Sequence, residues 1–352
     1  MHTYRHFIPR NTAPAGAQRI VVRDDSGEQV CTVPLGPLTP PGGEPLYRFG
    51  VVADIHLWKN NSATYGNSNE KFDRALTFFE ERGCACCVVA GDLTITGFYT
   101  RTDEGDASTQ SLDVGQFAQY KSICDSHAIP VHALCGNHES YYSMPVANNL
   151  ALLETYTGRG VLSYAVEQGN DLFILCGQPS PNAVMSDADF QWLGETLEAN
   201  KGRRCFLFIH SHIDDNIAGG VEDSGNPAFA RENSIFAYWG AAKTAAFIAL
   251  LQKYPNVILF HGHTHMMFEG QQFDPAANYS RENGFHSVHV PSLALPRRLT
   301  AADGTWVSAN GDSQGYIVDV YADCIVLNGW DFVGGEPVAI GTYKIDVQGV
   351  TA

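Results

Sequence analysis

Five short polar segments, most of them directly after an apolar run, constrain this chain more than any other feature. They are Asp54-Ile55-His56, Gly91-Asp92, Gly136-Asn137-His138-Glu139, His210 and Gly262-His263-Thr264-His265. A short apolar run predicts a buried strand, which would deliver the residues that follow it into a cleft. Carboxylate, imidazole and amide ligands that converge from several strand ends are what a pair of divalent cations needs. The sequence therefore predicts a fold in which several strand ends meet at one metal site.

The net charge of the chain and the length of its apolar stretches limit the kinds of partner that it is expected to bind. Its 352 residues carry a formal net charge of −16 at pH 7, and binding to nucleic acid or to an anionic membrane needs a basic patch instead. No stretch approaches the ~20 apolar residues that cross a bilayer. We expect a small-molecule partner and neither nucleic acid nor a membrane, and the oligomeric state stays open. A phosphate substrate remains compatible, because bound cations dominate the local charge of a site.

The nine cysteines favour a reducing, cytoplasmic setting, because most of them stand inside apolar runs as small buried side chains. Cys84, Cys86 and Cys87 allow two interpretations, a thiolate cluster or a strand that runs into Val88, and the strand is favoured. Residues 1–20 lack the apolar core of a secretion signal.

The order of predicted elements divides the chain into three parts. Residues 1–45 form an N-terminal extension, with a β-hairpin over 19–34 and a linker rich in Pro and Gly. Residues 46–300 alternate strands with helices, the helices being expected at 69–82, 113–128, 145–157, 186–200 and within 233–254. Residues 301–352 read as a C-terminal β segment packed on the central domain. Alternation followed by a strand-rich tail favours an α/β sandwich over an all-parallel sheet.

Each polar segment suits a metal ion for its own reason. In Asp54-x-His56 the period-2 geometry of a strand would turn both side chains to one side, so that both reach one ion. The glycine before Asp92 lets the backbone approach closely, and the two carboxylate oxygens can bridge two ions. His263 and His265 could each reach an ion across a sharp turn. A set without sulfur suits Mn, Fe, Zn or Co.

Two ions about 3.5–4 Å apart can hold a bridging hydroxide as nucleophile and clamp both oxygens of an in-line displacement. Asp-x-His or Gly-Asp alone occurs often by chance. All five segments in this order, most of them at predicted strand ends, are not expected by chance.

The set resembles the calcineurin-like metallophosphoesterase superfamily, whose pattern is D-x-H, G-D, G-N-H-[D/E], H and G-H-x-H. The resemblance extends from about residue 48 to about residue 294. It implies a four-layer α/β/β/α sandwich with two mixed sheets, strand-rich N- and C-terminal extensions, and a catalytic domain within 46–300. It also implies two divalent or mixed-valence transition metal ions of unassigned identity (Mn, Fe or Zn). One ion would be held by Asp54, His56, Asp92 and His265, and the other by Asp92, Asn137, His210 and His263.

The resemblance assigns His138 to catalysis rather than to metal binding. Such a histidine contacts the phosphate and protonates the leaving oxygen, which leaves badly as an alkoxide. Glu139 and His261 are candidates for holding the ligands or the substrate in place. For the lone histidine ligand, His210 is favoured because it ends its strand directly. His212 remains the alternative, or a substrate contact, and it stands where the family often has proline.

The segment Gly91-Asp92-Leu93-Thr94-x-x-Gly97 resembles the phosphodiesterase branch of the superfamily, although that branch often has Asp where Ile95 stands. We therefore expect a phosphodiesterase that acts on a small molecule or nucleotide. A phosphomonoesterase or nucleotide pyrophosphatase with the same site is the alternative, and a non-enzymatic scaffold on the same fold is a third. Loops 97–112 and 211–232 are expected to shape the pocket.

Overall fold

The computed structural model describes most of the chain from residue 43 to residue 347, together with two strands before it. The described residues are 19–23, 29–34, 43–58, 63, 66–95, 109–143, 146–178, 180, 184–213, 239–269, 278–281, 284–299 and 306–347. Most of the two loops expected to shape the pocket lies outside them. Among the helices of this described part, none is long and apolar enough to cross a membrane.

One sheet unites the first strands of the central region with the C-terminal strands. Its order is β16-β15-β14-β3-β4-β5, with β17 paired to β15. The strands are β3 (Tyr47–Val52), β4 (Cys87–Val89), β5 (Val131–Ala133), β14 (Gln314–Val320), β15 (Cys324–Asp331), β16 (Glu336–Pro337) and β17 (Tyr343–Asp346). Strands β3, β4 and β5 are parallel, whereas β14 joins β3 antiparallel. The C-terminal strands therefore extend the sheet that carries Asp54 and Asp92 at its strand ends.

The second sheet has six strands in the order β10-β11-β9-β8-β7-β6. They are β6 (Ser163–Gln168), β7 (Asp171–Cys176), β8 (Cys205–Phe208), β9 (Val257–His261), β10 (Tyr279–Ser280) and β11 (His286–His289). The four middle strands are parallel and the two edge strands antiparallel. Because the carboxyl ends of parallel strands share one edge, the segments after β7, β8 and β9 emerge together.

Aromatic side chains fill the space between the two sheets. The Phe49 ring of β3 lies 4.7 Å from that of Phe173 and 5.0 Å from that of Phe206, both on the second sheet. All three are fully buried, and each buried aromatic contributes a large apolar area. This layer fixes the two sheets face to face.

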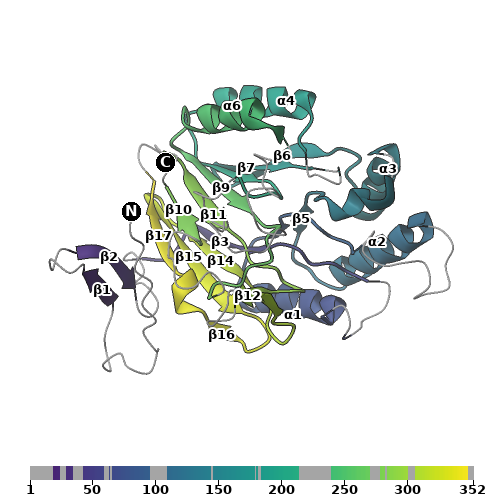
Figure 1. The fold of residues 1–352 in the computed structure, drawn as a ribbon, viewed down its shortest axis with the longest axis horizontal. Coiled ribbons are helices and arrows are strands. Elements are labelled where there is room, and N and C mark those ends of the chain that lie inside the picture. Colours follow the sequence, from purple (N-terminus) through teal and green to yellow (C-terminus); the bar gives the residue numbers. More distant parts are fainter. Residues whose placement is uncertain are drawn as a thin grey trace.

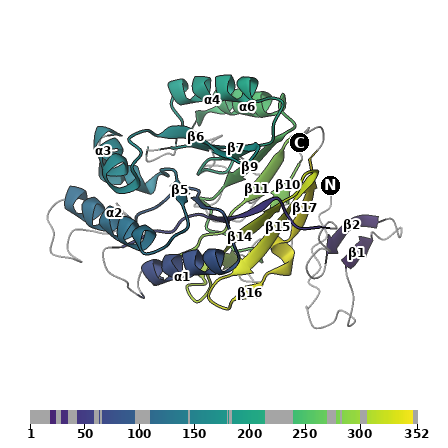
Figure 2. The same cartoon turned by 180° about the vertical axis from the view of Figure 1, so that it is seen from behind.

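Helices cover the outer face of each sheet (Figures 1 and 2). Helices α1 (Ser68–Glu81), α2 (Thr109–Asp125) and α3 (Val146–Thr157) pack on the first sheet, and α4 (Asp187–Ala199) and α6 (Ala241–Leu251) on the second. The predicted four-layer α/β/β/α sandwich with two mixed sheets is confirmed. The N-terminal hairpin, β1 (Arg19–Arg23) with β2 (Gln29–Pro34), is antiparallel as predicted.

The local sequence explains where the helices begin and end. Helix α1 buries Phe72, Ala75, Leu76 and Phe79 at helical spacing. Helix α4 starts at the predicted cap, where the Ser186 hydroxyl accepts a 3.0 Å hydrogen bond from the Asp189 amide. Two elements depart from the prediction. Helix α2 begins four residues before 113, and His138–Ser143 forms a 3-10 helix, η3, that the sequence did not indicate.

A buried ion pair joins the two sheets through the amino ends of their strands. The Arg204 guanidinium donates to both carboxylate oxygens of Asp171, at 3.1 and 2.7 Å, and to the Tyr321 carbonyl at 2.9 Å. Tyr47 of the first sheet donates a 2.6 Å hydrogen bond to the same carboxylate. Arg204 is 2% exposed, so these contacts compensate for the loss of its hydration.

Candidate metal centre

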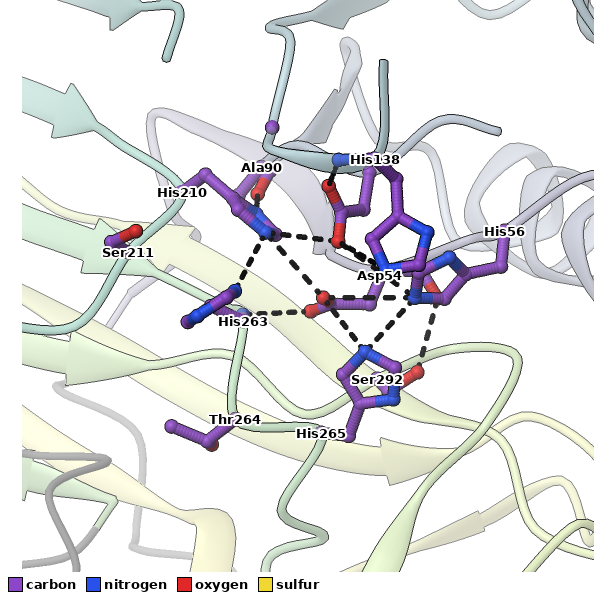
Figure 3. A network of polar contacts seen from close by, with 12 residues as sticks. Asp54, His56, Ala90, His138, His210, Ser211, His263, Thr264, His265 and Ser292 are labelled. Atoms are coloured by element: carbon purple, nitrogen blue, oxygen red, sulfur yellow. Dashed lines mark hydrogen bonds and ion pairs between the residues drawn. The ribbon is translucent and has the colours of Figure 1, made fainter. Parts of the chain in front are cut away.

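Two groups of buried carboxylates and imidazoles meet at the carboxyl edge of the two sheets (Figure 3). One group contains Asp54, His56, Asp92 and His265, and the other contains Asp92, His210 and His263. In each group the candidate ligand atoms lie within 4.8 Å of one another. Asp92 belongs to both groups, as expected of a carboxylate that bridges two ions. The sequence resemblance implied Asp54, His56, Asp92 and His265 for one ion, and Asp92, Asn137, His210 and His263 for the other.

In the first group two imidazoles face each other beside a carboxylate. His56 Nε2 lies 2.9 Å from His265 Nε2, and His265 Nε2 lies 3.2 Å from Asp54 Oδ1. The second oxygen of Asp54 accepts a hydrogen bond of 3.0 Å from the His263 amide. One oxygen of Asp54 therefore fixes the turn after β9, and the other is turned to the cluster.

The second group repeats this arrangement around Asp92. His210 Nε2 lies 3.1 Å from Asp92 Oδ2 and 3.2 Å from His263 Nδ1. The other oxygen of Asp92 accepts a 2.9 Å hydrogen bond from the His138 amide. Both carboxylates thus hold a backbone turn with one oxygen and face imidazoles with the other.

Backbone carbonyls fix the tautomers of two histidines. His210 Nδ1 lies 2.9 Å from the Ala90 carbonyl and His265 Nδ1 lies 3.2 Å from the Leu295 carbonyl. A carbonyl only accepts hydrogen bonds, so each Nδ1 carries the proton and donates it. Each Nε2 is directed into the cluster, where the neutral form of the imidazole would offer its lone pair to a metal.

The donor set fits two divalent cations. Imidazole nitrogens approach each other to 2.9 and 3.2 Å in two pairs. Asp54 Oδ1 and Asp92 Oδ2 are buried and accept no hydrogen bond from the described residues. Buried carboxylate oxygens are costly to leave unpaired. Shared cations would satisfy both the paired nitrogens and these oxygens.

The backbone at the candidate ligands is strained. Among the described residues, six that are not glycine have positive φ, and five of them are in the cluster: Asp54 at 51°, His56 at 41°, Asp92 at 52°, His263 at 76° and His265 at 60°. The left-handed conformation costs a non-glycine residue about 1–2 kcal/mol. Such strain persists only where the surrounding structure imposes it, and it concentrates at functional sites.

The left-handed backbone also shows that the predicted explanation for the Asp54-x-His56 spacing was wrong. The sequence predicted that Asp54 and His56 would share a side through the alternation of an extended strand. Instead both residues lie beyond β3 in left-handed turns, held by 3.1 and 3.0 Å hydrogen bonds from their amides to the carbonyls of Gly91 and Asp92.

Two glycines are required for the close approach of these segments. Gly91 has φ +91°, and a Cβ there would come within 2.6 Å of His210 Cγ. A Cβ on Gly136 would collide with Asp92 Oδ1 and come within 2.7 Å of His210 Cδ2. Any side chain at either position would push His210 out of place.

Burial and neighbouring charges set the protonation of the cluster. Burial opposes ionisation of Asp92, but the imidazoles of His210 and His138 outweigh it and hold the pKa of Asp92 well below its ordinary value. Burial lowers the pKa of His138 to about 4 and that of His263 to about 3. His210 is the exception, because Asp92 outweighs its burial and raises its pKa to about 9.

The turn after β5 carries three predicted residues, Asn137, His138 and Glu139. The His138 ring lies 4.4 Å from the His56 ring, and His138 Nε2 lies 3.7 Å from Asp92 Oδ2. Asn137 is buried, and the backbone amide of the next residue, His138, donates to Asp92. Glu139 braces the turn instead of facing the cluster. It accepts hydrogen bonds from the amides of Thr94, at 2.9 Å, and Gly136, at 2.7 Å.

The structure places His210, and not His212, in the cluster. His212 is 1% exposed and its ring stacks on that of His263 at 5.9 Å. Neither of its ring nitrogens has a hydrogen-bond partner among the described residues. His261 is buried at the end of β9, with its ring 5.8 Å from that of His289. Both histidines lie beside the cluster rather than in it.

Two supporting residues were missed from the sequence. Ser292 donates a 3.0 Å hydrogen bond to the Asp54 carbonyl and so fixes the turn after β3. The Gln178 side chain accepts hydrogen bonds from the amides of His210 and Ser211, at 2.6 and 2.8 Å. Gln178 could have been found, because it also follows an apolar strand at the same edge of the sheet.

Comparisons with known proteins agree with this arrangement. A model of the calcineurin-like phosphoesterase family matches residues 47–267, well over half of the chain. A comparison with curated proteins gives no match. The fold is similar to that of a dimetal phosphatase from Danio rerio, with a TM-score of 0.57 and 15% identity over 87% of this chain and 100% of that one.

It is also similar to a purple acid phosphatase from yellow lupin (Lupinus luteus) seeds. The TM-score is 0.56 and the identity 12%, over 92% of this chain and 58% of the lupin chain. At these identities the structural neighbours show the fold. The family match spans the segments that supply the clustered residues, and with the buried Asp/His cluster it suggests a dinuclear metal site. The chain belongs to the calcineurin-like phosphoesterase family and is a hydrolase that acts on phosphate esters.

Proposed function

We propose that the protein is a metal-dependent phosphodiesterase that acts on a small molecule or nucleotide. Asp54, His56, Asp92 and His265 would hold one cation, and Asp92, Asn137, His210 and His263 the other. Mn, Fe or Zn suits this set of nitrogen and oxygen donors. When bound, the two cations supply Lewis acidity to the phosphate and activate water for attack.

The residues of the chain supply position and protons. The His138 amide is anchored to Asp92, so the His138 imidazole is held at the edge of the cluster. From there an N–H of the His138 imidazole would donate a hydrogen bond to the leaving oxygen as negative charge develops on it. The ligands themselves are buried or nearly so, which excludes bulk water and strengthens each electrostatic contact with the substrate.

The charge of the site is the observation that supports the proposed preference for a diester. Burial has the largest effect on the pKa values of Asp54, Asp92 and His138, and the charged groups that act on them next are the carboxylates and imidazoles of the cluster itself. Within this cluster the cations alone would therefore balance the charge of the substrate. A phosphodiester carries one negative charge and a monoester near neutral pH up to two, so the diester needs less compensation. The Gly91-Asp92-Leu93-Thr94 segment favours the same branch.

The test is a comparison of two chromogenic substrates, bis(p-nitrophenyl) phosphate and p-nitrophenyl phosphate, on protein loaded in turn with Mn, Fe and Zn. We expect kcat/KM to be at least about tenfold higher for the diester and to be abolished by a chelator. A higher kcat/KM for the monoester would overturn the proposal. Asp92→Asn should remove the activity, whereas Asp187→Asn, an exposed acid on α4, should leave it unchanged.

A nucleotide pyrophosphatase would use the same residues, so a substrate with a pyrophosphate link belongs in the same experiment. Preferential cleavage of that link would replace the diesterase proposal. A purely structural scaffold is disfavoured, because this chain keeps the candidate ligands together and His138 beside Asp92.

A further inference from the structure

Gln178 connects two of the turns that carry the metal centre. It follows β7, and its backbone amide donates a 2.8 Å hydrogen bond to the Cys135 carbonyl, directly before the Gly136-Asn137 turn. Its side chain reaches the other turn, where His210 and Ser211 leave β8. Gln178 is fully buried. It therefore lies between the segment that carries Asn137 and the segment that carries His210.

The orientation of this carboxamide is fixed by its partners. One side-chain atom receives hydrogen bonds from two consecutive backbone amides, at 2.6 and 2.8 Å. Only an oxygen can accept from two N–H donors, so this atom is Oε1 and the other is Nε2. Each of the two bonds restrains a residue of the turn, and together they set the direction in which His210 leaves the strand.

With Oε1 assigned in this way, the other side-chain atom is Nε2, which is buried and has two N–H groups to donate. No described residue accepts a hydrogen bond from Nε2. The hydroxyl of Ser211, in the turn that Gln178 holds, is likewise buried without a partner among the described residues. Buried polar groups are normally satisfied, so the acceptor for this donor is a group outside the described residues, and a ligand bound at the site is one such group. A phosphate ester offers several oxygens that only accept.

We infer that Gln178 belongs to the site in two ways: Oε1 positions the His210 turn, and Nε2 donates to the bound phosphate ester. This inference rests on the proposed function only in its second part. The first part concerns metal binding, and groups that orient a ligand typically change metal affinity by about 10–100-fold. Replacement of a residue with a purely structural role would change the free energy of unfolding and leave the metal affinity unchanged.

Three variants distinguish the role of Gln178 Oε1 from that of Gln178 Nε2. Gln178→Ala removes both, and Gln178→Glu keeps two acceptor oxygens but has no donor while ionised. Gln314→Ala is the matched control, because Gln314 is also buried and accepts a backbone hydrogen bond, from Phe268 at 2.7 Å, while its Nε2 is paired with Glu269. If the alanine variant is too unstable to purify, Gln178→Met fills the same volume without an acceptor.

Metal titration of the metal-free proteins, followed by calorimetry, tests the positioning role. Gln178→Ala should lose about 10–100-fold in affinity for one of the two cations, Gln178→Glu should restore it, and Gln314→Ala should bind as wild type does. Wild-type affinity for both cations in Gln178→Ala would overturn this role. Since no substrate is present, the result is independent of whether the protein is a diesterase.

Inhibition by inorganic phosphate tests the donor role on the metal-loaded enzymes. Gln178→Glu should need at least about tenfold more phosphate for half inhibition, since it has lost the donor and its carboxylate repels the anion. Equal inhibition of Gln178→Glu and wild type would overturn the donor role. If the wild type did not prefer diesters, the proposed function would be refuted instead. The comparison of phosphate inhibition would remain a valid test of the donor role, because every phosphoester offers the same acceptor oxygens.

Discussion

The His263 amide donates a 3.0 Å hydrogen bond to Asp54 Oδ2 across 209 positions of the chain. It joins the turn after β9 in the second sheet to the turn after β3 in the first. The carboxyl edges of the two sheets are thereby held together at the place where the candidate ligands gather. The same carboxylate then faces His265 with its other oxygen, so that a single residue both builds the site and belongs to it.

Replacing Asp54 by asparagine should separate these two tasks. In Asp54→Asn the amide oxygen can still accept from His263, so we expect the fold to persist. The negative charge toward His265 is lost, and one cation per chain should be lost with it. Because groups that merely orient ligands change affinity or activity by about 10–100-fold, we expect kcat/KM to fall by at least about 100-fold.

Elemental analysis and initial rates measure the outcome for Asp54→Asn. The control is Asp319→Asn, which breaks an ion pair with Arg48 away from the cluster and should keep both cations. Two tightly bound cations in Asp54→Asn would show that Asp54 is not a ligand.

A methyl group at Gly91 should displace His210. In Gly91→Ala the new Cβ collides with the His210 ring and the backbone is strained at φ +91°. Gly335→Ala is the matched control, since Gly335 has φ +69° and nothing within 4 Å of a Cβ. We expect about 1 kcal/mol of destabilisation in the control from the backbone alone, and a further ~1–3 kcal/mol in Gly91→Ala from overpacking. Denaturant unfolding measures both, and equal values would contradict the predicted collision.

Removing the guanidinium of Arg204 should destabilise the sandwich without altering the site. Arg204→Met leaves the Asp171 carboxylate buried at the opposite edge of the sheets, and loss of one partner of a buried pair costs about 3–5 kcal/mol. The double variant Arg204→Met, Asp171→Leu should recover part of this loss, because no buried charge remains. Where the single variant is folded, its metal content should equal that of wild type. A change in unfolding free energy below about 1 kcal/mol would contradict the prediction.

His127 lies far from the metal centre and should make the free energy of unfolding depend on pH. It contacts Glu80 and Asp73 at 3.0 Å each, and although its burial acts in the opposite direction, these carboxylates raise the pKa of His127. A raised pKa means that the contribution to stability is fully present below the ordinary histidine pKa of about 6.5. It is lost as the pH rises through the pKa of the folded state.

The hydrogen bond from His127 also lowers the pKa of Glu80. Its contribution is present above the ordinary glutamate pKa of about 4.3 and is lost as the pH falls through the lowered value. The unfolding free energy of wild type should therefore exceed that of His127→Gln most between these two limits. Denaturant unfolding of metal-free protein across the pH range checks this, and a difference independent of pH would count against it.

The positions of the strand ends could be predicted from the sequence. Apolar runs such as Phe49–Ala53 and Val257–Phe260 must be buried on both faces, and a polar residue directly after such a run marks the point where the chain leaves the sheet. Five segments of this kind, in an order that resembles one family, indicated which residues would meet. The helices followed from their periodicity and from caps such as Ser186.

The support of the site could not be predicted in this way. The position of Gln178 after an apolar strand marks it as a residue near the site, but not its contact with His210 across 32 positions. No local pattern encodes that contact or the one from Ser292 to Asp54 across 238 positions. The choice between His210 and His212 also depended on the three-dimensional structure, because both follow β8 and differ only in which one the turn directs toward Asp92.

By itself, the sequence determined the alternation of strands and helices and the residue types at the strand ends, because hydrophobic periodicity and residue chemistry are local properties. The two mixed sheets with their helical layers were implied by the resemblance of the polar segments to one family. Only the tertiary structure decided that Asp54, His56, Asp92, His263 and His265 adopt left-handed backbone conformations. An isolated chain avoids these conformations, and they persist here because packing between the sheets and hydrogen bonds between distant turns outweigh the local strain.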